Sequence, residues 1–374
     1  MKQSKGIMSL QSSSVTRLFI FLLIFLSLIV WSGNALAGTE DNTAPYEYLV
    51  QPSDKILPKL EKAIKEGKLD YYKYLLKKPD YENPDVMELV KANWCQFKWK
   101  FAETALQDKE MQKKEGIRYK GFCPVAAVAT RINRRGEKRE SAMLRWAKNY
   151  HLTDTGYDFK DLTLFLSPED IRHLAVLVLD YLDPARDQDS FLWLPSLRKV
   201  RRVAQAAKED SFGGMDITYF DMVLREPGDE DHKILRTEIV GDELINQAKK
   251  ENTIPQVIKY FESLRGKKVF VIESIQKRGF LSWHKRVWWY NPENGRDFRR
   301  LFYDKAGRLV KIYNISFRKS PFYGDPNKFG WSEDWHHVQN TLTGHSTMAF
   351  MAPLIFDVPV PDSHFTHRYL QRMK

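Results

Sequence analysis

The chain has 374 residues, with 59 Lys and Arg against 48 Asp and Glu and a formal net charge of +11. This length excludes a chain too small to bury a core of its own, and it allows either two domains or one large domain with additions. The balance of charges is basic, and the sequence contains only two cysteines.

The first predicted element is a secretory signal peptide over residues 1–37. Lys2, Lys5 and Arg17 precede an almost unbroken apolar run over residues 18–31, and Ala35-Leu36-Ala37 follows as a small-x-small cleavage site. The run is shorter than the roughly 20 residues that a membrane-spanning helix requires. We expect cleavage after Ala37 and export to the periplasm. The alternative is an uncleaved N-terminal anchor.

Removal of this segment takes away three positive charges and no negative ones, which leaves a formal charge of +8. Outside the cytoplasm nucleic acid is a poor candidate partner for a basic protein, and anionic lipid headgroups or an acidic protein surface are better ones. The alternative is that the charge serves only solubility.

The two cysteines, Cys95 and Cys123, are expected to form a disulfide in an oxidising compartment. Such a bond would close a loop of about 27 residues and stabilise the protein by roughly 3 to 4 kcal/mol. The alternative is two buried free thiols. A metal site is hard to build here because neither cysteine has a histidine nearby.

Residues 38–118 predict a small, charged helical region. Its clearest segment is "SDKILPKLEKAIKEG", in which Ser53 is a possible N-cap, apolar residues recur at helical spacing, and Gly67 marks the end. A further helical segment is expected near Pro84. We interpret the region as helical and not catalytic.

After Gly121 the pattern changes to short β-like runs separated by Gly, Pro, Asn or Asp. A hairpin is expected around residues 134–137, a three-stranded meander over residues 284–317, and a strand-turn-strand around Thr343-Gly344. Residues 167–172 predict one helical turn, with a strand taking over from Leu174. The spacing indicates a sandwich or barrel of antiparallel strands.

The sequence offers no catalytic constellation. It contains no Gly-rich phosphate loop, no G-x-S-x-G elbow and no H-E-x-x-H helix. His336 and His337 would point to opposite faces of a strand, so they cannot easily share one metal ion. Asp216 and Asp221 lie near Ser211, but no oriented base accompanies them. We therefore expect no catalytic residues, no metal, no cofactor and no enzymatic activity, and a hydrolase that uses the late histidines is kept as a third class.

Aromatic residues are 13% of the chain, and many lie on the predicted strands. One such strand carries Leu192, Trp193 and Leu194, all of which need apolar cover. That cover is either a core with covering helices or a cavity for an acyl chain, where each buried methylene contributes about 0.8 kcal/mol. Because Arg198, Arg201 and Arg202 fall on both faces of the following strand, we expect it to leave the core at a rim, where the charges meet an anionic headgroup, guide docking or are simply solvated.

Two stretches in this part of the chain, "WLPSLRKVRR" and "DSFGGMDITYFDM", resemble the signature of the LolA-like outer-membrane lipoprotein-sorting protein family. The likeness extends over "INRRGEKR", "FLSPEDIR", "YDKAGRL" and "FTHRYLQR", and it covers residues 119–374. Phe220 replaces an acidic residue of the pattern, which puts a polar role at that position in doubt. The matching positions of the second stretch are Asp210, Ser211, Phe212, Gly214, Asp216, Tyr219 and Asp221.

The resemblance implies an incomplete antiparallel β-barrel covered by helices, a mainly β protein with helices (α+β), in residues 119–374. It also implies a monomeric periplasmic carrier that binds lipid or lipidated protein in an apolar cavity and often works with an RND-type exporter of the inner membrane. The alternative function is an accessory subunit of such an exporter that holds no ligand. The expected lipid-binding residues are Leu192, Trp193, Leu194, Phe212 and Tyr219, and Arg198, Arg201 and Arg202 are expected at the rim.

Overall fold

In the computed structural model, all described residues belong to one compact unit that runs from Tyr48 to Lys374. The structure describes residues 57–99 except 68, residues 104–105, and residues 125–372 except 184, 204–210, 219–220, 222–225, 253, 278–281, 323–324, 353, 357 and 359. The predicted signal peptide with its cleavage site after Ala37, Cys123 and Tyr219 lie outside the described residues. Within the described part, no helix has the length and apolar character that a membrane span requires.

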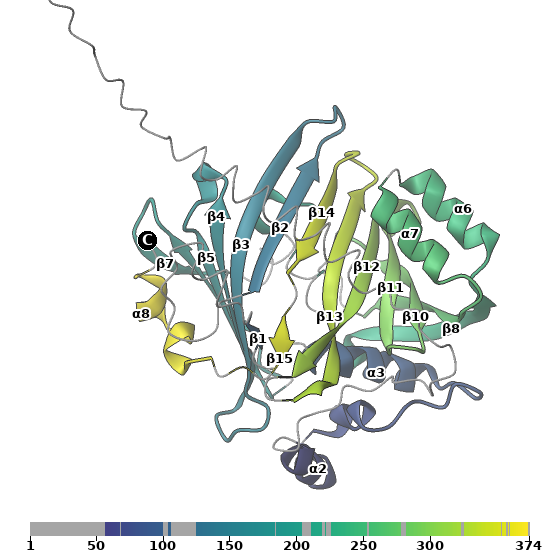
Figure 1. The fold of residues 1–374 in the computed structure, drawn as a ribbon, viewed down its shortest axis with the longest axis horizontal. Helices are drawn as coiled ribbons and strands as arrows, with labels where there is room; N and C mark the ends of the chain where they lie inside the picture. Colours follow the sequence, from purple (N-terminus) through teal and green to yellow (C-terminus); the bar gives the residue numbers. More distant parts are fainter. Residues whose placement is uncertain are drawn as a thin grey trace, which may run out of the picture. The chain divides into compact units, whose positions relative to one another are not determined.

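A single 15-stranded sheet dominates the fold, with its main path in the order β7-β6-β5-β4-β3-β2-β14-β13-β12-β11-β10-β9-β8 (Figure 1). Neighbours along this path pair antiparallel, for example Val287 with Leu301 and Val176 with Leu192. The two end strands, β7 and β8, do not pair with each other, so the sheet is open. This architecture confirms the predicted fold class.

The strand bounds follow the predicted turns closely. The strands are β1 (Thr104–Ala105), β2 (Val125–Ile132), β3 (Lys138–Asn149), β4 (Tyr157–Ser167), β5 (Ala175–Tyr181), β6 (Asp189–Leu194), β7 (Lys199–Arg202), β8 (Glu230–Ile239), β9 (Lys268–Gln276), β10 (Lys285–Asn291), β11 (Arg296–Tyr303), β12 (Leu309–Phe322), β13 (Asp325–Asn340), β14 (Ser346–Met351) and β15 (Ile355–Phe356). The hairpin of β2 and β3, the meander of β10 to β12 and the hairpin of β13 and β14 are as the sequence predicts. The single helical turn before β5 is also confirmed, as the 3-10 helix η2 (Glu169–Ile171).

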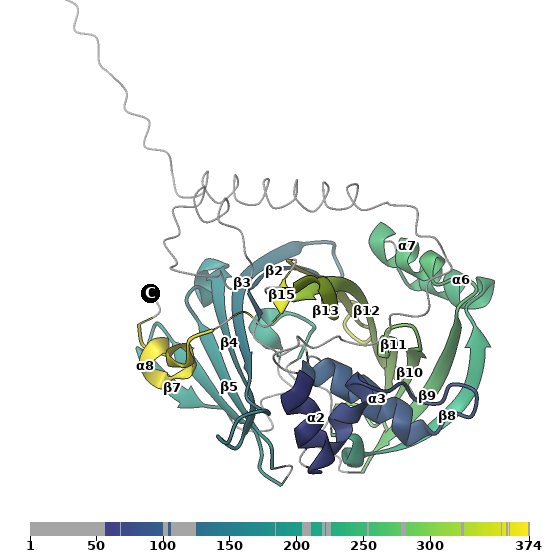
Figure 2. The same cartoon turned by 60° about the horizontal axis from the view of Figure 1, so that its bottom comes forward.

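The helices lie on both faces of this sheet. They are α2 (Leu57–Lys65), η1 (Asp70–Leu75), α3 (Val86–Trp99), η4 (Phe212–Gly214), η5 (Pro227–Asp229), α6 (Asp242–Glu251), α7 (Pro255–Ser263), η6 (Asp362–Phe365) and α8 (His367–Leu370). In Figure 2, α3 lies inside the curve of the sheet, whereas α6, α7 and α8 lie outside it. We call the face that contacts α3 the inner face and the opposite one the outer face.

The outer face is apolar under both groups of covering helices. Phe261 of α7 packs with Trp289, Phe298 and Trp335 of the sheet, which anchors the α6–α7 pair to β10, β11 and β13. At the other end of the sheet, the C-terminal segment covers Trp146, Leu162, Leu177 and Trp193 with Val360, Phe365 and Leu370. The covering helices therefore remove the apolar side chains on this face of the strands from water, as the sequence pattern requires.

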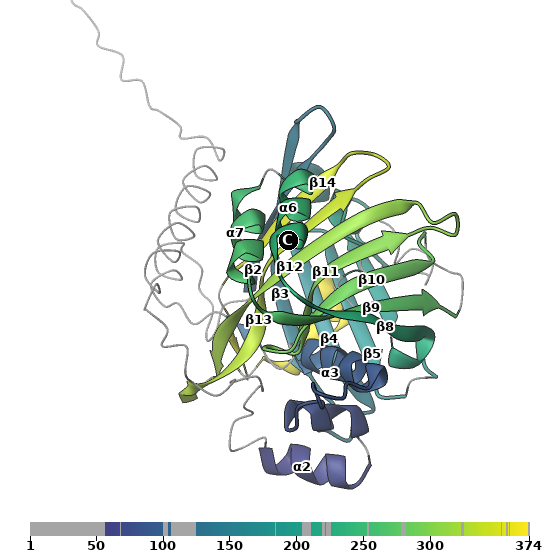
Figure 3. The ribbon, with the colours of Figure 1, turned by 90° about the vertical axis from the view of Figure 1, so that its right-hand side faces the viewer.

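The predicted helical region packs onto the inner face. Leu89 and Val90 of α3 pack on Phe270, Ile272 and Trp288 of β9 and β10. The opposite flank of the sheet meets the same region through a second cluster, which joins residues of α2, η1 and α3 to Ala147, Phe159 and Val178. Helix α3 therefore connects the two arms of the curled sheet and covers part of its inner face (Figure 3).

Candidate functional site

The inner face of β8 to β12 carries buried ion pairs. Arg286 on β10 donates from Nε and Nη2 to the two carboxylate oxygens of Glu230 on β8, at 3.1 and 2.6 Å. Arg300 on β11 pairs in the same bidentate way with Asp297. All four side chains are buried. Because a buried charge without its partner is costly, this part of the inner face is fixed by mutual pairing and is not an apolar wall.

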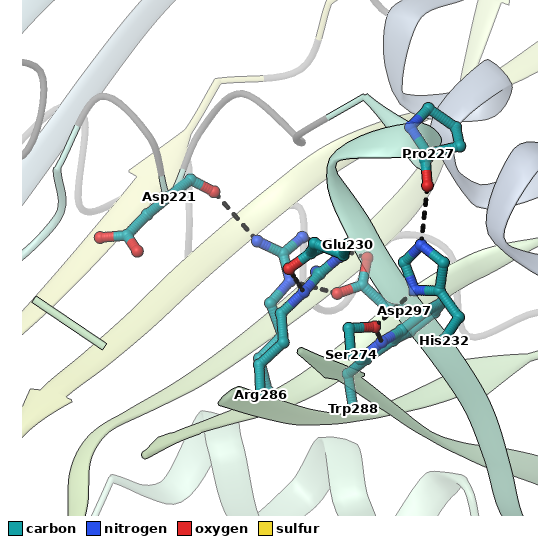
Figure 4. Close-up of polar contacts among 9 residues, drawn as sticks. Asp221, Pro227, Glu230, His232, Ser274, Arg286, Trp288 and Asp297 are labelled. Atoms are coloured by element: carbon teal, nitrogen blue, oxygen red, sulfur yellow. Dashed lines mark hydrogen bonds and ion pairs between the residues drawn. The ribbon is translucent and has the colours of Figure 1, made fainter. Parts of the chain in front are cut away.

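A neutral polar cluster lies beside the Arg286–Glu230 pair (Figure 4). His232 Nε2 lies 2.9 Å from the Pro227 carbonyl oxygen, which can only accept, so Nδ1 accepts from the Ser274 hydroxyl at 2.8 Å. Trp288 Nε1 donates to the same Ser274 oxygen at 2.8 Å. Burial lowers the pKa of His232, which favours the neutral ring. Since Ser274 is fully buried, this serine–histidine contact is a structural link between three strands and not an accessible nucleophile.

Two further contacts tie the segment before β8 to the sheet. Arg300 Nη1 donates to the backbone oxygen of Asp221 at 3.0 Å, and Lys311 Nζ donates to both carboxylate oxygens of Asp221 at 3.1 and 2.8 Å. Burial alone would raise the pKa of Asp297, but Arg300 lowers it below its ordinary value. The network therefore favours the ionised form of Asp297 and holds residue 221 against the inner face.

Helix α3 closes the other side of this network. Arg296 Nη1 donates to the backbone oxygen of Gln96 at 2.8 Å, and the Asp297 amide donates to Asn93 Oδ1 at 3.2 Å. Burial lowers the pKa of Arg296 to about 10, with Glu333 and Asp297 acting in the opposite direction. These bonds fix α3 over β11 and remove that area from contact with a guest molecule.

The segment 211–218, which carries most of the described signature residues, packs into the inner face over β2, β4, β13 and β14. Met215 and Ile217 are buried there. The Asp216 amide donates to Thr347 Oγ1 at 2.9 Å, the Thr347 hydroxyl donates back to Asp216 Oδ2 at 2.9 Å, and Arg131 Nε lies 3.6 Å from that carboxylate. Acidic residues of the signature thus anchor the segment to the sheet.

Phe212 reaches the inner face through this segment. Its ring lies 5.3 Å from that of Phe165 on β4, centroid to centroid. Gly213 has a φ of +60°, and a Cβ there would lie 2.4 Å from Phe165 Cε1, so the position requires glycine. Phe212, one of the predicted lipid-binding residues, therefore lies on the inner face and is partly buried against the sheet; lipid binding by it stays a prediction.

An apolar strip lies on the inner face next to the open edge at β7. Strand alternation and pairing place Leu192 opposite Val176 and on the same side as Leu194, and all three are only partly buried. Arg201 pairs with Leu192 and Lys199 with Leu194 on the edge strand, and both cations are exposed. The arrangement puts apolar surface and positive charge side by side, with cations at the margin.

Trp193 has a different place from its two neighbours. It lies on the outer face, buried with Phe365 and Leu370 of the C-terminal segment. Successive residues of a strand point to opposite faces, so Trp193 cannot line one cavity together with Leu192 and Leu194. Its place among the predicted lipid-binding residues is therefore corrected to support of the sheet from outside.

The predicted rim arginines are exposed at or near the edge strand, but they do not share a face. Arg198 lies in the β6–β7 turn with a φ of +49°. Arg202 is on the outer side, where it forms an ion pair with Asp189. Only Arg201 lies on the side of the apolar strip, together with Lys199, which was not among the predicted rim residues. The distribution of the cations over both faces is the one that the sequence predicts, except that Arg198 lies in the turn before β7 and not in the strand; their contact with a headgroup stays a prediction.

The predicted cysteines and late histidines do not form a site in the described part of the structure. Cys95 is buried on α3, and burial raises the pKa of its thiol well above the ordinary value. Because Cys123 lies outside the described residues, the disulfide stays a prediction. His336 stacks on Tyr313, while the neighbouring His337 lies on the other face near Arg299, as alternation predicts. Within the part of the chain that the structure describes, no group of His, Cys, Asp and Glu is arranged to hold a metal ion.

The buried charge network was missed by the sequence analysis. The signal that could have found it is the occurrence of Arg286, Arg296 and Arg300 inside aromatic-rich strands of an interior meander, where both faces are expected to be covered. Their partners come from distant strands and loops, such as Glu230 and Asp221. Pairing of this kind is not visible in the periodicity of a single strand.

Comparison with known proteins supports the fold. No curated protein matches the chain. A domain described as an outer membrane lipoprotein-sorting protein, from Vibrio parahaemolyticus, has 19% sequence identity and a TM-score of 0.55, and the match covers 77% of this chain and 98% of that domain. A DUF1329 family protein from Desulfovibrio piger has 23% identity and a TM-score of 0.52, with coverage of 66% of this chain and 90% of that one.

An open, mainly antiparallel sheet with helices on its inner and outer faces is the architecture of the LolA-like lipoprotein-sorting proteins, and the described chain has this fold. A family model described only as that of an uncharacterized protein matches residues 158–372, which is more than half of the sequence. The chain belongs to the family that this model describes, and its fold is LolA-like.

Proposed function

We propose that the protein is a non-enzymatic carrier of the periplasm that binds a lipid or a lipidated protein on the inner face of its sheet and shuttles it across the envelope. The single observation that carries the proposal is the half-buried strip of Val176, Leu192 and Leu194, flanked by Lys199 and Arg201 at the open edge. Its support from the comparisons is at the level of fold.

The chemistry of the strip fits an acyl chain that ends in an anionic group. Each methylene that leaves water for the strip contributes about 0.8 kcal/mol, and the two cations next to it attract a phosphate or carboxylate. The strip continues toward Phe165, Leu174 and Phe212, which share an apolar cluster. A guest would therefore lie along β4 to β6 and under the segment 211–218.

The rest of the inner face limits where a guest molecule can bind. The ion pairs on β8 to β12 and the cover provided by α3 make that half unsuited to a long hydrocarbon. One cavity of about 340 Å³ lies on the helical region and is lined mostly by charged residues, which are Lys73, Lys77, Lys78, Asp80 and Glu88, together with Tyr74 and Pro79. The guest site is thus proposed at the apolar strip only, and not in a hollow that spans the whole sheet.

The carrier would work as an exported monomer without a cofactor. The basic, apolar and small-residue parts of residues 1–37 support export and cleavage after Ala37. An RND-type exporter of the inner membrane is the proposed partner, on the resemblance of the signature stretches alone.

The test is lipid extraction from protein purified natively after export, followed by mass spectrometry. The wild type should yield a bound lipid, and the double variant Leu192→Gln with Leu194→Gln should yield at least about tenfold less, since two of the strip's apolar contacts are lost. The control is Leu182→Gln, an exposed leucine after β5 that lies away from the strip. A wild type that yields no lipid would contradict the carrier proposal.

A second function is favoured by the position of α3. A helix that is hydrogen-bonded over the inner face by Arg296 and Asn93 leaves less room for a guest, as expected of an accessory subunit that holds no ligand. Cross-linking in cells separates the two: an exporter captured by a wild type that carries no lipid supports the accessory subunit, whereas a lipid-loaded protein supports the carrier.

A further inference from the structure

Three turns at one end of the sheet lie next to one another. They are residues 133–137 between β2 and β3, residues 341–345 between β13 and β14, and residues 304–308 between β11 and β12, which follow one another in the strand order. The first two project together in Figures 1 and 3, and the Arg134 side chain packs at Gly344. The Thr341 amide donates to the Val310 oxygen at 3.1 Å, which joins the second turn to the start of β12, directly after the third turn. We call these three turns the docking end.

Leu342 lies at the apex of the central turn with 61% of its surface exposed. Its conformation is fixed, because Asn340 Oδ1 accepts from the amides of Leu342 and Thr343 at 3.1 Å each, and the Gly344 amide donates to the Asn340 backbone oxygen at 2.9 Å. Gly344 has a φ of +71°, which closes the turn. A rigid turn therefore presents an exposed leucine to solvent, and this side chain adds nothing to the hydrophobic core of the fold.

A lone exposed leucine is ordinary, so the surrounding charges decide the interpretation. Exposed cations flank Leu342 on both neighbouring turns and at the start of β3, namely Arg134, Arg135, Lys305 and Lys138. The acidic residues of the three turns, Glu137 and Asp304, are fewer than the cations, and both are hydrogen-bonded within their own turn. Glu137 accepts from Asn133 Nδ2 at 2.6 Å, and Asp304 accepts from Arg308 Nε at 2.8 Å. The docking end therefore shows positive charge around an apolar apex.

We propose that the docking end attaches the protein to an anionic phospholipid bilayer, with Leu342 entering the headgroup region and the four cations contacting lipid phosphates. A cation close to an anionic membrane surface strengthens binding about fivefold, and this attraction weakens with salt. Charge complementarity favours a bilayer, because headgroups offer a continuous anionic plane that three adjacent turns can meet at once. The surface is separate from the apolar strip, so it adds a membrane-contact step to the proposed carrier function.

The test is flotation of the protein, purified after export, with vesicles of phosphatidylcholine alone and of phosphatidylcholine mixed with phosphatidylglycerol, at low and high salt. The wild type should float with the anionic vesicles at low salt only. The double variant Arg134→Gln with Arg135→Gln should bind roughly twenty-five-fold more weakly, and Leu342→Ser about tenfold more weakly.

Two matched controls keep the test specific. Leu182→Ser removes an exposed leucine in the β5–β6 turn, at the opposite end of the strands, and Lys59→Glu with Lys65→Glu reverses two exposed charges on α2. Both should float as the wild type does. The inference is overturned if the wild type ignores anionic vesicles, for instance because it binds only a protein partner, or if the controls lose binding as much as the docking-end variants. Co-purifying lipid should be unchanged in all of them, so a failed carrier proposal would leave the vesicle result standing.

Discussion

Replacement of Gly213 by alanine tests whether the segment 211–218 is held against the sheet as described. Gly213 has a φ of +60°, and an added Cβ would lie 2.4 Å from Cε1 and 2.6 Å from Cζ of Phe165. Phe165 is fully buried and packs with Met143 and Tyr313, so its ring has little room to move. The left-handed backbone costs about 1–2 kcal/mol and overpacking about 1–3 kcal/mol, which gives a loss of roughly 2–5 kcal/mol.

The matched control is the next residue. Gly214 also has a positive φ, of +81°, but a Cβ there would meet only Arg139 side-chain atoms at 3.8 Å or more. Gly214→Ala should therefore cost only the backbone part, about 1–2 kcal/mol. Urea unfolding with linear extrapolation measures both variants. Equal losses for the two, or no loss for Gly213→Ala, would refute the packing of the segment against Phe165. Phe165→Leu in the Gly213→Ala background should recover part of the loss, because it removes the ring atoms that clash.

Three further predictions concern buried groups. Arg286→Met should lower the free energy of unfolding by about 3–5 kcal/mol, because it leaves Glu230 buried and unpaired. The control Lys285→Met changes a partly exposed ion pair on the same strand and should cost less than about 1 kcal/mol. Urea unfolding of both variants measures the difference. Burial and a nearby arginine lower the pKa of His337 to about 4. Below the ordinary histidine pKa of about 6.5, the unfolded chain therefore binds more protons at this residue than the folded protein does. The free energy of unfolding should fall by on the order of 3 kcal/mol as the pH drops from about 6.5 to 4, and His337→Asn should lose this pH dependence. A His337→Asn variant with the same pH dependence as the wild type would contradict that assignment. Cys95 should resist alkylation in the folded protein, since its thiol is buried and its pKa raised, and mass spectrometry of unfolded protein before and after reduction shows whether it is paired; rapid labelling of the folded protein would speak against the buried position.

The division of the inner face bears on how a guest would be held. On β8 to β12, Arg286 and Arg300 occupy inward positions that a purely apolar carrier would fill with aliphatic side chains. Because each of these arginines is paired with a carboxylate, their side chains are held in one geometry, but the charged pairs replace apolar side chains that would contribute hydrophobic burial. On β5 and β6 the inward-facing Val176, Leu192 and Leu194 are apolar and only partly buried. Guest contact is therefore expected where Leu192 and Leu194 lie and not where α3 is bound.

The amino-acid sequence by itself determined the strands and their turns. Alternation and turn residues act over a few positions, so the meander of β10 to β12, the hairpin around Gly344 and the helical turn at Ile171 were all predictable. The alternation of Leu192 and Trp193 was equally visible in the sequence.

Only the tertiary structure decided which face each side chain meets. Trp193 lies under Phe365, from a segment more than a hundred residues later, and Lys311 meets Asp221, which is 90 residues earlier in the chain. Such contacts depend on the order of strands in the sheet and on where α3 and the segment 211–218 pack. Periodicity along one strand carries no information on these partners, because it defines two faces without saying what covers either of them.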